Sequence, residues 1–117
     1  MGHLSTHVLD TAHGCPAAGM VVTLQRVQGG AATTVKRITL NQDGRGEGPL
    51  LSAQDMAAGQ WRLLFEVAPY FRARGVELPE VPFIDTVQID FGIADPAGHY
   101  HVPLLASPWS YSTYRGS

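Results

Sequence analysis

Histidine is the residue type in this 117-residue chain best suited to proton transfer, and four of the five histidines form two close pairs. Side chains two residues apart in a strand point to the same side, so His3 shares a strand face with His7, and His99 with His101. Imidazole titrates near pH ~6.5 and can accept a proton from water near neutrality. Two such strands lying side by side would direct all four rings into one cleft, whereas the simpler interpretation is a set of polar residues on solvated faces.

The same spacing would suit a zinc ion, since strand residues at i and i+2 can both act as ligands. A third ligand is not evident, so we expect no metal. The single cysteine, Cys15, excludes an intrachain disulfide and a cysteine-based zinc finger. Cys15 stands beside Pro16 in a predicted turn, which favours a structural role.

Arg45 is the second candidate, because it follows Asp43 and Gly44 in a sequence typical of a tight turn. A guanidinium held out by a stiff turn can present its planar donors to carbonyl or carboxylate oxygens. An exposed arginine on a hairpin is the competing interpretation.

The third candidate is the tail of residues 114–117, which either frays, as termini usually do, or is clamped in a site.

The elements that must position these groups are strands, because the hydrophobic pattern has a period of two and not of 3.6. One helix of about two turns is predicted over residues 68–75, with Pro69 near its start and Gly75 just past its end. Seven or eight short strands with frequent turns predict an antiparallel β-sandwich, formed by one domain over residues 1–117. The predicted strands cover residues 3–10, 20–28, 33–40, 60–67, 85–94, 99–106 and 109–114.

Composition limits the possible partners. The net charge of −2 argues against electrostatic binding to nucleic acid. No apolar run approaches the ~20 residues of a membrane span, and the first residues do not resemble a secretory signal, so we expect a cytoplasmic protein. The phosphate-binding loop and the serine-nucleophile motif are absent. The Thr-, Ser- and Tyr-rich final strand is an edge that could pair with a second copy.

Motifs spread over nearly the whole chain resemble the transthyretin superfamily, and within it the 5-hydroxyisourate hydrolases. They are LSTHVLD at residues 4–10, DGR at 43–45, HYHVPLL at 99–105 and YSTYRGS at 111–117. The terminal YRGS is the most specific element. Transthyretins themselves carry thyroid hormone, lack this ending, and have Lys, Glu and Thr at the positions of His7, Arg45 and His101. These differences favour the hydrolase branch.

The resemblance implies an all-β, eight-stranded sandwich with one short helix. It also implies a homotetramer, built as a dimer of dimers, with active sites at the dimer–dimer interface. The implied reaction is hydrolysis of the cyclic amide C–N bond of 5-hydroxyisourate, which yields 2-oxo-4-hydroxy-4-carboxy-5-ureidoimidazoline without a cofactor. The functional positions of the family correspond to His7, Arg45, His101 and residues 114–117.

Chemistry suggests a role for each of these positions. His101 is the expected general base, and His7 is expected to orient the water or to hold charge on the opening ring. The sequence does not separate these two roles. Arg45 is expected to grip the substrate carbonyls and to stabilise the oxyanion.

The tail is expected to complete the substrate site. Tyr114 would hydrogen-bond to the flat ring or stack on it, while Arg115 and the Ser117 carboxylate would close the cleft. Attack by Ser117 itself ranks below attack by water. The competing classes of function are a transthyretin-type carrier of small ligands without catalysis, and an immunoglobulin-like interaction module without any site.

Overall fold

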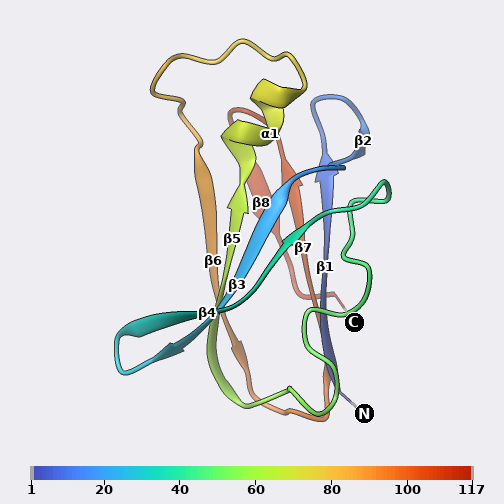
Figure 1. Ribbon diagram of the computed structural model, residues 1–117, viewed down its shortest axis with the longest axis vertical. Helices are drawn as coiled ribbons and strands as arrows, with labels where there is room; N and C mark the ends of the chain where they lie inside the picture. Colours follow the sequence, from blue (N-terminus) through green and yellow to red (C-terminus); the bar gives the residue numbers. More distant parts are fainter. Residues whose placement is uncertain (1, 117) are drawn as a thin grey trace.

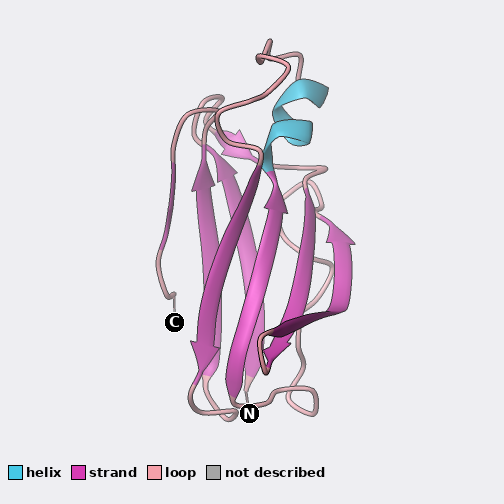
Figure 2. Ribbon diagram, turned by 90° about the vertical axis from the view of Figure 1, so that its left-hand side faces the viewer, coloured by secondary structure: helices cyan, strands magenta, loops and turns pink. Residues whose placement is uncertain are grey.

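Two four-stranded sheets packed face to face form the computed structural model, which describes residues 2–116 (Figures 1 and 2). Their strand orders are β2-β1-β7-β8 and β4-β3-β5-β6. The elements are β1 (His3–Asp10), β2 (Cys15–Pro16), β3 (Val21–Gln28), β4 (Ala31–Thr39), β5 (Gly59–Glu66), α1 (Val67–Ala73), β6 (Thr86–Ile93), β7 (His99–Ala106) and β8 (Tyr111–Thr113). The prediction of an all-β sandwich with one short helix is confirmed.

Alternation along the strands decides which faces form the core. Every second side chain of β1 and of β5 is buried between the sheets. Leu4 and Val8 of β1 are fully buried, as are Leu63 and Phe65 of β5. Burial of one large apolar side chain stabilises the fold by about 1.5–3 kcal/mol, so a one-residue slip that exposes this set is strongly disfavoured. The alternate residues His3, Ser5 and His7 therefore project from the outer face of their sheet.

The pairing of β1 with β7 is parallel, whereas the other paired strands run antiparallel. This pair is a parallel exception within the antiparallel sandwich predicted from the sequence. The reason is the path of the chain, which crosses from β6 to β7 through a turn at residues 95–98. That turn lies against the start of β1, where the N–H of His3 donates to the Gly98 carbonyl at 3.3 Å. Both strands therefore begin at the same end of the sandwich.

Most element boundaries differ from the predicted ones by one or two residues, and three of these differences concern the description of the site and its surroundings. Cys15 and Pro16, expected in a turn, pair with the end of β1 as the short strand β2. The last strand begins at Tyr111 and not at residue 109, because the Ser107 hydroxyl accepts the N–H groups of Trp109 and Ser110 and holds them in a turn. The helix begins at residue 67, one residue earlier than predicted.

The helix α1 covers one end of the sandwich, opposite the end at which β1 begins (Figure 2). Tyr70 and Phe71 are buried on its inner side. Within residues 2–116, no helix is long and apolar enough to cross a membrane.

Candidate active site

The parallel ladder between β1 and β7 brings the two histidine-bearing strands together. Its register places His3 opposite His99 and Ser5 opposite His101. All four side chains, and that of His7, lie on the outer face of the sheet, because the alternate residues of both strands fill the core. The ring centroids of His3 and His99 are 4.3 Å apart. The two pairs thus converge on one sheet face, as their spacing predicted.

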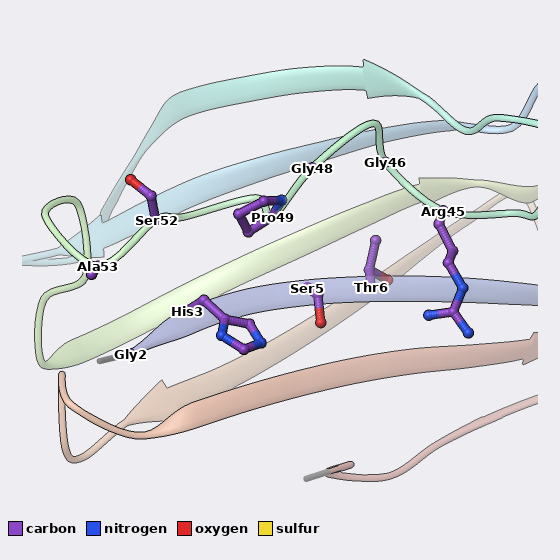
Figure 3. Close-up of a pocket in the computed structure, with 10 residues that line it drawn as sticks. All are labelled: Gly2, His3, Ser5, Thr6, Arg45, Gly46, Gly48, Pro49, Ser52 and Ala53. Atoms are coloured by element: carbon purple, nitrogen blue, oxygen red, sulfur yellow. The ribbon is translucent and has the colours of Figure 1, made fainter.

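Arg45 reaches this face from a rigid turn between β4 and β5. The Asn41 carbonyl accepts the N–H of Gly44 at 2.9 Å, and the Asn41 Oδ1 accepts the N–H of Arg45 at 3.1 Å. Gly44 has a φ of +71°, and a Cβ there would lie 2.6 Å from the Val8 carbonyl oxygen. The turn is therefore pressed against β1, and Arg45 forms an isolated β-bridge with His7. Figure 3 shows the guanidinium extending across β1.

Burial and nearby positive charge favour the neutral form of His7 and His101. Burial lowers the pKa of His7 below its ordinary value and Arg45 lowers it further, while a hydrogen bond with the Asp43 backbone works in the opposite direction. Burial is also the main cause of the lowered pKa of His101, followed by the charges of Arg45, His7 and His3. The neutral ring is the form that accepts a proton, so both residues are suited to act as a base near neutral pH.

The ring of His101 is contacted on both flanks. Its Nδ1 lies 2.9 Å from the Ser5 Oγ. On the other flank, a Cβ at Gly116 would lie 2.8 Å from Cδ2, so only glycine fits without displacing the ring. Ser5 was not among the predicted site residues, although its position between His3 and His7 on the same strand face was an available signal.

Within one subunit, only part of the tail lies beside His101. The N–H of Gly116 donates to the His101 carbonyl at 2.7 Å, which brings the end of the chain to the site. The Arg115 guanidinium instead lies 4.1 Å from the Tyr100 ring centroid, with a hydrogen bond to the His99 carbonyl at 3.1 Å. Arg115 and Tyr114 line a separate cavity of about 240 Å³ between β6 and the end of the chain.

The structure therefore brings together His7, Arg45 and His101 but not the side chains of Tyr114 and Arg115. Ser117, the remaining predicted site residue, lies outside the described residues. Among residues 2–116, no three His, Cys, Asp or Glu side chains are grouped so that they could hold a metal ion.

A cavity of about 480 Å³ adjoins the beginning of β1, and His3 is the one histidine among its described lining residues (Figure 3). It lies between β1 and the loop of residues 45–53, with His3, Ser5 and Arg45 among its lining residues and Ser52 on the loop side. A concave space of this size with a few converging polar groups is typical of a small-molecule site.

Comparison with known proteins finds relatives along nearly the whole chain. The model of the HIUase/Transthyretin family matches residues 4–116. The chain is 52% identical over 117 residues to the 5-hydroxyisourate hydrolase of Pseudomonas aeruginosa, covering 100% of this chain and 93% of the relative. It is 51% identical to the 5-hydroxyisourate hydrolase of Ralstonia nicotianae, with full coverage of both chains.

Solved structures show the same relationship. An (S)-allantoin synthase matches with a TM-score of 0.92 at 46% identity, over 99% of this chain but only 44% of that one. Klebsiella pneumoniae 5-hydroxyisourate hydrolase matches with a TM-score of 0.82 at 38% identity over 100% of both chains. Sea bream transthyretin in complex with thyroxine matches with a TM-score of 0.84 at 28% identity, over 97% and 93%. With its fold, its sequence and a family model in agreement along nearly its whole length, the chain belongs to the HIUase/Transthyretin family.

Proposed function

We propose that this protein hydrolyses 5-hydroxyisourate by adding water across the cyclic amide C–N bond of its six-membered ring. The product, 2-oxo-4-hydroxy-4-carboxy-5-ureidoimidazoline, carries a carboxyl and a ureido group, which are the two ends of the broken bond. The observation that carries the proposal is the convergence of His7, Arg45 and His101 on one sheet face. Relatives named 5-hydroxyisourate hydrolase, about 50% identical over the full length, support it.

His101 serves as the general base in the proposed mechanism. Its neutral ring takes a proton from water as the water oxygen attacks the ring carbonyl, a contribution of about 10²–10⁴-fold in rate. His7 orients the water or holds charge on the opening ring. It is the alternative base, because burial and Arg45 lower its pKa as they lower that of His101.

Arg45 stabilises the oxyanion formed by the attack. Loss of one such donor costs about 2.7–4 kcal/mol in activation free energy in enzymes that use an oxyanion hole. When the intermediate collapses, the C–N bond breaks and the imidazolium returns its proton to the departing nitrogen. The hydroxyl of the water thereby becomes part of the new carboxyl group, and its proton becomes part of the new N–H. No cofactor is required.

The proposed assembly is a homotetramer built as a dimer of dimers, with the sites at the dimer–dimer interface. The site lies on an outer sheet face, where a facing subunit would enclose it. Aromatic side chains are exposed near the free edges of β6 and β8, which is typical of strands that pair with a second copy. They are Phe83, Trp109, Tyr111 and Tyr114. Sedimentation equilibrium is expected to give about four times the chain mass of 12.6 kDa, and a monomer mass would contradict this assembly.

Tyr114, Arg115 and the Ser117 carboxylate remain proposed substrate-binding groups of the assembled site, with Tyr114 also proposed to act in catalysis. A cytoplasmic location is proposed as well, and the single thiol, Cys15, is compatible with a reducing compartment. No specific observation favours the non-catalytic carrier, because the transthyretin match is weaker in identity than the hydrolase matches.

A spectroscopic assay tests the proposed function directly. Freshly generated 5-hydroxyisourate is followed with and without the protein, and heat-denatured protein serves as the control. Faster decay in the presence of the native protein supports hydrolysis. Binding of the compound without any acceleration would instead support the carrier.

A further inference from the structure

We propose that Ser5 is a positioning residue of this site, whose hydroxyl fixes the orientation and the tautomer of His101 so that Nε2 presents a lone pair to the attacking water. The inference rests on the proposed hydrolase function and adds to it the group that prepares the base.

The contact is built by strand register. Ser5 on β1 lies directly opposite His101 on β7 in the parallel ladder, and both side chains project from the outer face. The Ser5 Oγ lies 2.9 Å from Nδ1, a good hydrogen-bond distance, and the contact is partly buried. In Figure 3 the hydroxyl points from β1 toward the neighbouring strand. Backbone pairing thus delivers the hydroxyl to one particular ring atom.

Gly116 blocks the opposite flank of the ring. A Cβ at this position would lie 2.8 Å from Cδ2 and 3.2 Å from Cγ of His101, so the Gly116 backbone packs closely against that side. Nδ1 and Cδ2 are the two ring atoms bonded to Cγ, and both are therefore held. The covalent geometry of the ring then directs its far edge, Cε1 and Nε2, away from the sheet.

The surroundings select the tautomer. A neutral imidazole carries one N–H and one lone pair, while a serine hydroxyl can rotate to act as donor or acceptor. Arg45 lies close enough for its positive charge to act on His101. Its guanidinium group has only hydrogen-bond donors, so it favours the tautomer with a lone pair on the outward nitrogen, Nε2. The Nδ1–H then donates to the Ser5 Oγ, and Nε2 is free to take a proton from water.

The test compares Ser5→Ala with the wild-type protein. We expect kcat to fall about 10-fold, which corresponds to about 1.4 kcal/mol in activation free energy, with KM changed by less than about twofold. Nitrogen NMR of ¹⁵N-histidine-labelled protein is expected to show a protonated Nδ1 on His101 in the wild type and a mixture of tautomers in the variant. Ser5→Thr keeps the hydroxyl and is expected to restore both signals.

Two further variants make the result specific. Thr33→Ala removes an exposed hydroxyl from β4 in the other sheet, and it is expected to leave kcat unchanged. If Ser5→Ala fails to fold, Ser5→Cys keeps a similar size with a much weaker hydrogen-bonding group and is expected to show the same loss of kcat.

Full kcat with an unchanged His101 tautomer in Ser5→Ala would overturn the positioning role. A raised KM at unchanged kcat would overturn it as well, since Ser5 would then be a substrate-binding group. If the wild-type protein does not accelerate the decay of 5-hydroxyisourate, the proposed function fails, while the tautomer measurement still decides whether Ser5 controls His101.

Discussion

Three contacts hold His101 where a base is required. Ser5 and Gly116 flank the ring, and the backbone carbonyl of His101 accepts the Gly116 N–H at 2.7 Å. Burial and the charge of Arg45 then lower the pKa of the ring, which favours the neutral form that can take up a proton. At the scale of the residue, the site consists of ordinary side chains whose surroundings set their protonation state and direction.

Replacing His101 with Asn should remove the proposed base while keeping a polar side chain of similar size. We expect the turnover of 5-hydroxyisourate to fall by at least about 10²-fold. The side chain lies on an outer face, so the thermal unfolding midpoint should change little. His13→Asn, in the turn that follows β1, is the matched control for activity. Decay at the wild-type rate in the His101 variant would refute its role.

The pH profile follows from the direction of the pKa shifts. A base must be neutral, so kcat/KM should fall as pH drops through the imidazole pKa. Because burial and Arg45 lower the pKa of His7 and His101, this fall in kcat/KM is expected below pH ~6.5.

Reversing the charge with Arg45→Glu should move this acidic limb of the pH profile to higher pH and weaken the binding of a urate-like analogue. An unmoved limb together with unchanged affinity would remove Arg45 from the site.

At the scale of elements, two segments without regular structure deliver groups to the strands. The turn from Asn41 to Arg45 is fastened to β1 by the Val8 N–H, which donates to the Gly44 carbonyl at 2.9 Å. The C-terminal segment continues beyond β8 and returns to β7 at His101. The long strands provide the platform, and these short segments complete the site.

Deleting residues 114–117 should abolish activity without unfolding the sandwich. The paired residues of β8, Tyr111–Thr113, remain, whereas the packing of Gly116 against His101 is lost. Circular dichroism and thermal unfolding report on the fold, and the decay assay reports on the activity. Gly116→Ala is the finer variant, since its methyl group should displace the ring and reduce kcat. If the truncated protein still turns over substrate, the tail is only the end of a strand.

At the scale of the whole molecule, a buried carboxylate joins β1 to the helix. Asp10 is fully buried, and its carboxylate accepts hydrogen bonds from the Tyr70 hydroxyl at 2.7 Å and from the His13 backbone N–H at 2.9 Å. The His13 Nδ1 also lies 2.6 Å from the Asp10 Oδ2. Burial alone would raise the pKa of Asp10, but the hydrogen bonds from Tyr70 and His13 outweigh it and hold the pKa below its ordinary value. Burial and then Asp10 raise the pKa of Tyr70, which keeps its hydroxyl as a donor.

Acid should therefore weaken the fold through Asp10. A carboxyl with a lower pKa in the folded than in the unfolded chain stabilises the fold above its unfolded pKa of ~3.9, and this contribution is lost as pH falls through the folded value. Asp10→Asn should reduce the free energy of unfolding at pH 7 by about 1.5–3 kcal/mol and flatten its dependence on pH below ~4. Urea unfolding at pH 7 and at pH 3 measures both effects. Equal acid sensitivity in the two proteins would contradict this role.

Much of the fold was predictable because it is encoded over short distances in the chain. The alternation of apolar and polar residues that predicts a strand can be recognised from the residues of that strand alone. The tight turn before Arg45 can likewise be recognised from residues 41–44 alone. The convergence of the two histidine pairs was also predictable as a hypothesis, since their spacing determines which side chains share a face.

The amino-acid sequence by itself determined the strands, their buried faces and the residue types available for proton transfer. Only the tertiary structure decided that Ser5 contacts His101, 96 residues away, that Gly116 supports the same ring, and that the Arg115 side chain turns to Tyr100. The physical reason is that pairing between distant strands depends on how two whole sheets bury their apolar faces and on where the chain crosses between them. No local pattern records that choice, so the parallel register of β1 and β7 and the contacts that it creates emerge only when the sandwich forms.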